Sequence, residues 1–192
     1  MLRKRKSGSD ERFLFISETE KTMLKKDSYV MKTGDGVCLV MEELCMKAPG
    51  SPAPVPYYRL QPLKDPGSSV FVPVKEHYPD IRPVLTKEEA EDLIENVSEI
   101  DPGTLPEGKK GDSRFLEALY SGDPKTLVGL IKGLFLKARE RSSSGRPKIA
   151  AEERAFRMAE EILYSELALV LNISEEEVLE RLRLSAEKKT CE

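Results

Sequence analysis

The first part of the chain alternates apolar and polar positions over short distances, and turn residues interrupt it often. Between Leu24 and Leu85, runs rich in valine and tyrosine are separated by clusters of glycine, proline, serine and aspartate. Short strands at this spacing are typical of a small barrel. The expected strands cover residues 29–31, 37–44, 57–60 and 70–74.

From Thr86 onward the apolar positions recur every three to four residues, which predicts helices. Thr86 and Glu89 have the spacing of a capping box, in which each side chain accepts from the other's backbone N–H. Asp123 followed by Pro124 predicts a further helix start, and Asn172 is suited to end the long helix before it. The expected helices cover residues 86–97, 115–119, 124–138, 149–171 and 174–186.

These two patterns predict an α+β protein in which a barrel precedes a helical domain. Residues 1–22 show no lasting periodicity and are expected to form a flexible extension. The other expected units are a barrel at 23–85, a helix and linker at 86–110, and a helical domain at 111–190.

Charge is distributed unevenly along the 192 residues, although the net charge is only −3. Residues 109–148 hold ten Lys and Arg against four Asp and Glu, a net charge of +6. Residues 149–192 hold six against eleven, a net charge of −5. The basic segment permits a contact with nucleic acid, and a solvated helix face is the alternative interpretation.

Several function classes find no support in the residues. The three cysteines have no metal-ligand spacing, and the single histidine, His77, has no evident catalytic partner. No apolar run is long enough to cross a membrane, and the basic start lacks a secretory cleavage site. We therefore expect a cytoplasmic protein that is not an enzyme and holds neither a cofactor nor a metal.

Five motifs occur in an order that points to one family. They are Tyr57-Tyr58-Arg59-Leu60, Val72-Pro73-Val74, Ile81-Arg82-Pro83-Val84-Leu85, Leu119-Tyr120-Ser121-Gly122-Asp123, and the helical run from Ala159 to Ala168. From about Met23 to Leu184 the chain thus resembles the CarD/CdnL family of bacterial transcription regulators, which bind RNA polymerase.

The resemblance implies a Tudor- or SH3-like barrel that binds the β subunit of RNA polymerase, with strand addition at Val37–Met46 and Ser69–Val72. It also implies a helical domain that contacts promoter DNA near the upstream edge of the bubble, weakly and largely without sequence specificity, and so changes open-complex stability. The candidate polymerase-binding residues are Val40, Met41, Met46 and Phe71. The candidate DNA-binding residues are Lys109, Lys110, Arg114, Arg146, Lys148, Arg154 and Arg157.

The chain departs from the family pattern where DNA contact is concerned. The family commonly carries a tryptophan after the linker as an apolar wedge, whereas this chain has no tryptophan and places Gly108 near that position. Glu153, Met158 and Glu160 stand where basic residues are often found. The alternative function is therefore a polymerase- or protein-binding module with little or no DNA contact, and an enzyme is a third, weaker hypothesis.

Overall fold

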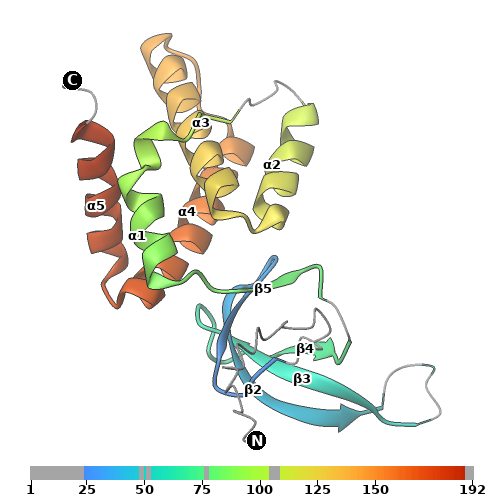
Figure 1. Cartoon of the computed structure of the whole chain (residues 1–192). Helices are drawn as coiled ribbons and strands as arrows, with labels where there is room; N and C mark the ends of the chain where they lie inside the picture. The colour runs from blue at the N-terminus through green and yellow to red at the C-terminus, as the bar shows by residue number, and fades with distance from the viewer. Residues whose placement is uncertain (1–23, 48–49, 51–52, 76–77, 104–108, 189–192) are drawn as a thin grey trace, which may run out of the picture.

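The computed structural model describes residues 24–47, 50, 53–75, 78–103 and 109–188, and of residues 109–114 and 187–188 it describes the backbone alone. A five-stranded sheet is followed by five α-helices (Figure 1). This confirms the expected α+β fold, a small Tudor- or SH3-like barrel followed by a helical bundle. The expected extension at 1–22 lies outside the described residues.

The sheet is antiparallel and has the strand order β4-β3-β2-β1-β5. Within the described residues its ladder does not close between β4 and β5, so these two strands are its edges. The last strand was not expected, because its sequence is short and contains a proline. The strands are β1 (Tyr29–Lys32), β2 (Gly36–Met46), β3 (Val55–Pro62), β4 (Val70–Pro73) and β5 (Ile81–Pro83).

Side chains on alternate positions of the central strands point to opposite faces of the sheet. Val30, Cys38 and Leu60 are buried in the barrel core. Met31 and Val37 are paired in the ladder and also buried, but they are not part of that core cluster. They therefore belong to the opposite face, which packs against the helices, as the contact between β2 and α4 shows.

The helices surround α4, which contacts α1, α2, α3 and α5. Their shared core contains the fully buried side chains of Leu127, Leu163, Leu167 and Val178. The helices are α1 (Lys87–Glu95), α2 (Lys109–Ser121), α3 (Pro124–Ser143), α4 (Ala150–Leu171) and α5 (Glu175–Lys188), with a 3-10 turn at Val97–Glu99.

The helix starts follow the predicted caps. The N–H of Glu89 donates to the Thr86 hydroxyl at 3.2 Å, and the Glu89 carboxylate accepts from the Thr86 N–H at 2.8 Å. Asp123 caps α3 with a 2.8 Å bond from the N–H of Thr126. Two boundaries differ from the prediction. Helix α2 begins inside the expected linker, and α3 extends into the expected loop because no helix breaker precedes Gly145.

Candidate functional site

One candidate surface is a free strand edge on the barrel. Strand β2 pairs with β3 as far as Met46, whereas its pairing with β1 ends at Leu39. Within the described residues, the second half of β2 thus has unpaired backbone groups on one side. Strand β4 is an edge strand, and its Phe71 side chain is 42% exposed. Unpaired edges of this kind can accept a strand from a partner.

The expected polymerase-binding residues do not all lie on this edge. Val40 is only 1% exposed because it packs in the barrel core, and the N–H and C=O of Val40 bond to Ser28 and Asp27. The assignment of Val40 to a docking surface was therefore wrong. The first part of the expected edge strand was also assigned wrongly, because it pairs with β1 in the interior of the sheet. Met41 and Met46 are half-buried on the free half of β2. They and Phe71 stay as candidates.

A second candidate surface lies at the end of the helical domain away from the barrel. The C-terminal end of α2 touches the barrel, since the Thr33 hydroxyl donates to the carbonyl of Tyr120 at 3.4 Å. The second half of α4 also touches the barrel, through an ion pair between Glu161 and Lys64. Both helices therefore begin at the far end, where the loop between α3 and α4 also lies (Figure 1).

We call Arg146, Lys148, Arg154 and Arg157 the basic end; all four are exposed. Lys148 pairs with Glu153 at 3.1 Å. The three arginines form no ion pair with any described residue. Their charges are thus available to an anionic partner.

Two acidic residues reduce the positive charge near the basic end. Glu152 accepts from Arg141 at 3.2 Å and lies 3.8 Å from Lys137, while Glu153 holds Lys148. The expected DNA-binding residues Lys109, Lys110 and Arg114 lie in the first two turns of α2, but their side chains and Gly108 are outside the described residues.

An ion pair between a half-buried arginine and a buried glutamate joins the two halves of the molecule. Arg82 on β5 donates two hydrogen bonds to Glu166 on α4, at 2.6 and 2.7 Å. A third bond to Glu166 comes from the N–H of Leu85 at 3.0 Å, and the Nε–H of Arg82 donates to the carbonyl of Gly122 at 2.7 Å. The carboxylate of Glu166 is fully buried. We call these groups the junction.

Sequence reasoning assigned no function to the junction, although a signal existed. Glu166 lies on the apolar stripe of α4, directly beside the buried Leu167 and three residues after Leu163. A charged residue on a buried stripe requires a partner of opposite charge. Arg82 was noted only as part of a family motif, because nothing local pairs it with a residue so distant in the chain.

Two titratable groups with shifted pKa values have structural roles. Burial lowers the pKa of Lys132, whose ammonium donates to the carbonyls of Val97 and of Ile100, the latter at 2.7 Å. Burial also raises the pKa of Tyr164, which donates to Glu160 at 3.1 Å. In the part of the chain that the structure describes, no three His, Cys, Asp or Glu residues converge on a metal position. None of its helices is long and apolar enough to cross a membrane.

The structure thus places a barrel with a free edge before a helical bundle with a basic end. Residues 113–183, which cover most of α2 to α5, match the family model of the CarD C-terminal domain. This match supports membership in the CarD/CdnL family, a family of non-enzymatic, transcription-associated regulators. No curated protein matches the chain.

Proposed function

We propose that the protein binds the β subunit of RNA polymerase through its barrel and contacts promoter DNA through its basic end, and thereby changes the lifetime of the open complex. The observation that carries this proposal is the placement of two binding surfaces on opposite parts of one molecule. The free strand edge lies on the barrel, whereas the arginines without an ion pair among the described residues lie on the α3–α4 loop and the first half of α4.

The polymerase contact is argued from the strand edge. Main-chain hydrogen bonds supply affinity when a partner strand adds to an open sheet, and side chains beside the edge supply specificity. Phe71 on β4 is the most exposed large hydrophobic side chain of the described barrel, and Met46 is half-buried on the free half of β2. An apolar partner surface fits these side chains better than a charged one.

The DNA contact is argued from charge. Arg146, Arg154 and Arg157 can each neutralise a phosphate, which positions a protein on DNA without reading its sequence. Lys148 is already paired with Glu153 and contributes less. Since the chain lacks the tryptophan that serves the family as an apolar wedge, we assign the interaction to phosphate contacts. The isolated protein should therefore bind duplex DNA weakly.

A specific observation favours a second function, a polymerase-binding module without DNA contact. Glu152 and Glu153 pair with three of the cations around the α3–α4 loop, so this region is less basic than its lysine and arginine count indicates. Both functions require the barrel to bind polymerase. They differ in whether the arginines of the basic end affect the open complex.

The polymerase contact is tested by truncating Phe71 to alanine. Because the exposed ring is removed from the docking edge, we expect affinity for polymerase to fall by about tenfold. Tyr29→Ala is the matched control, since Tyr29 is also an exposed aromatic of the barrel, 38% exposed, but lies on β1. Equal affinity losses in the two variants would contradict the assigned edge.

The DNA contact is tested by the open-complex lifetime on a promoter with purified polymerase. The double variant Arg154→Ala/Arg157→Ala should bind polymerase normally but lose most of the effect of the wild type. Arg181→Ala/Arg183→Ala, which removes the same charge from α5, should keep that effect. If both double variants act like the wild type, the second function is the better one.

A further inference from the structure

The junction connects three stretches of the chain that are far apart in sequence: residues 82–85, residue 122 and residue 166. Arg82 belongs to β5, Leu85 lies just before α1, Gly122 lies in the turn between α2 and α3, and Glu166 belongs to α4. All four are linked by the hydrogen bonds of one guanidinium and one carboxylate. Any rotation of the barrel against the helices therefore breaks several bonds at once.

Because Glu166 is buried, its carboxylate depends on hydrogen-bond donors at fixed positions. A buried carboxylate is tolerated only when hydrogen-bond donors and a positive charge satisfy it. The planar fork of Arg82 meets the planar carboxylate with two parallel bonds, which restricts the angle between them more than a lysine would. If Arg82 moved away, Glu166 would be left as an unpaired charge inside the helical domain.

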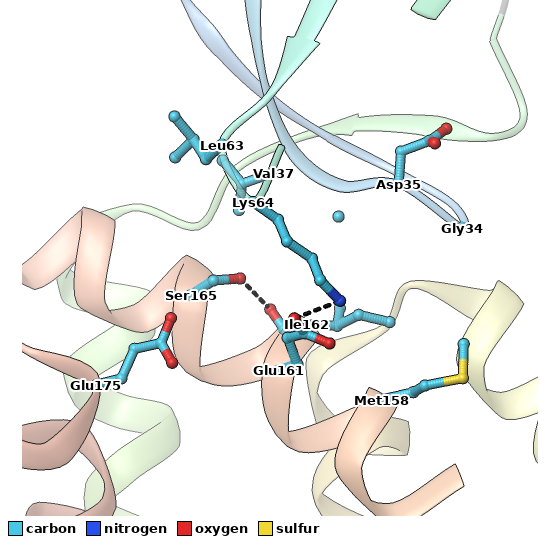
Figure 2. Close-up of a pocket in the computed structure, with 11 residues that line it drawn as sticks. Gly34, Asp35, Val37, Leu63, Lys64, Met158, Glu161, Ile162, Ser165 and Glu175 are labelled. Carbon is cyan, nitrogen blue, oxygen red and sulfur yellow. Dashed lines mark hydrogen bonds and ion pairs between the residues drawn. The ribbon is translucent and has the colours of Figure 1, made fainter. Parts of the chain in front are cut away.

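The remaining interface between the domains is more open. A cleft of about 280 Å³ lies between the barrel, which contributes Val37, and α4, which contributes Ile162 (Figure 2). An ion pair between Lys64 and Glu161 crosses this cleft, and its side chains are 66% and 41% exposed. Exposed ion pairs contribute little to stability. Among the described residues, the Arg82–Glu166 pair therefore restrains the two domains more strongly than the Lys64–Glu161 pair does.

Domains of one chain move relative to each other unless their interface is large and apolar. We propose that the Arg82–Glu166 pair fixes the angle between barrel and helical domain, and that this fixed angle lets one molecule engage polymerase and promoter DNA together. Arg82 and Glu166 are then positioning residues that touch neither partner. The second part of this inference rests on the proposed function, whereas the first part does not.

The angle is tested by spin-label distances in the full chain. Labels are placed at Asp65→Cys on the barrel and Glu180→Cys on α5, in a background with Cys45→Ser and Cys191→Ser. We expect a single narrow distance distribution for the otherwise unchanged chain and a distribution at least twice as wide for Arg82→Met/Glu166→Leu. Lys64→Ala is the matched control, because it removes only the exposed interdomain ion pair, and its distribution should stay narrow.

The double variant avoids leaving one buried charge alone, because replacement of a buried ion pair by apolar residues is often tolerated. Circular dichroism checks that it keeps the helix content of the wild type. A folded double variant with the narrow distribution of the wild type would overturn the inference, as would a Lys64→Ala variant that broadens equally.

The functional part is tested with the same variants on polymerase. Arg82→Met/Glu166→Leu should bind polymerase within about twofold of the wild type, as expected for an untouched edge, yet lose most of the change in open-complex lifetime. A broadened distribution with an unchanged lifetime effect would overturn this part. If the wild type itself leaves the lifetime unchanged, the proposed function fails, and the distance measurement alone decides whether the pair fixes the angle.

Discussion

Cys38 and Cys45 lie on the same strand in opposite environments, since Cys38 is buried and Cys45 is exposed. Burial raises the pKa of the Cys38 thiol to about 11. With Cys191→Ser as background, we expect one thiol to react with a disulfide reagent at pH 8, and the second only in urea, because reactivity requires access and a thiolate. Two thiols that react equally fast in the folded protein would contradict the burial of Cys38.

The raised pKa of Cys38 also gives a stability change with a definite sign. Since the folded-state pKa lies above the ordinary value of 9.0, ionisation favours the unfolded chain. The contribution to stability is fully present below pH 9 and is lost as the pH rises towards 11. The free energy of unfolding, measured in urea at pH 8 and at pH 10.5, should therefore fall more between the two pH values for the wild type than for Cys38→Ala.

Single residues were predictable where a local pattern determines their environment. Ala90, Leu93, Ile94 and Val97 have the spacing of one helix face, and all four are buried. The same spacing places Phe135 beside the buried Leu134 on the apolar stripe of α3, yet Phe135 is 57% exposed. The width of a buried stripe depends on which helices pack beside it, and that information is not local.

Asn172 ends α4 in the left-handed conformation, with φ of 54° and ψ of 49°. Residues with a Cβ atom, other than asparagine and aspartate, adopt this conformation at a cost of about 1 kcal/mol, and glycine adopts it freely. We therefore expect Asn172→Ala to lower the free energy of unfolding by about 1 kcal/mol. Asn172→Gly should leave it within about 0.5 kcal/mol. Urea unfolding followed by circular dichroism measures both, and equal effects of the two substitutions would contradict the backbone argument.

Elements with explicit end signals were predictable, and elements without them were not. The capping box at Thr86, the cap at Asp123 and the ending at Asn172 are all present. Strand β5 was missed because its three residues carry no alternation and pair with β1 only through a contact distant in sequence. The early start of α2 was missed because the glycine and proline before Lys109 indicate a linker.

At the scale of the whole molecule, the sequence predicted the two kinds of domain but not their relative placement. Arg82 and Glu166 are separated by 84 positions, so no local pattern indicates that they meet. The residues of the basic end were predicted as DNA-binding candidates, but not their position relative to the barrel. Their separation from the barrel follows from the direction of α2 and α4, whose C-terminal ends lie toward the sheet (Figure 1).

The separation of the basic end from the barrel leads to a prediction about how the affinity for DNA depends on salt concentration. If the basic end contacts phosphates, the affinity of the isolated protein for duplex DNA should fall with salt, with a slope of about three to five in log affinity against log salt concentration. Arg154→Ala should lower this slope by about one, because one phosphate contact is lost. Arg181→Ala removes the same charge from α5, so its slope should equal that of the wild type. If both substitutions lower the slope equally, DNA responds to the overall charge of the domain, and the basic end is not a distinct contact surface.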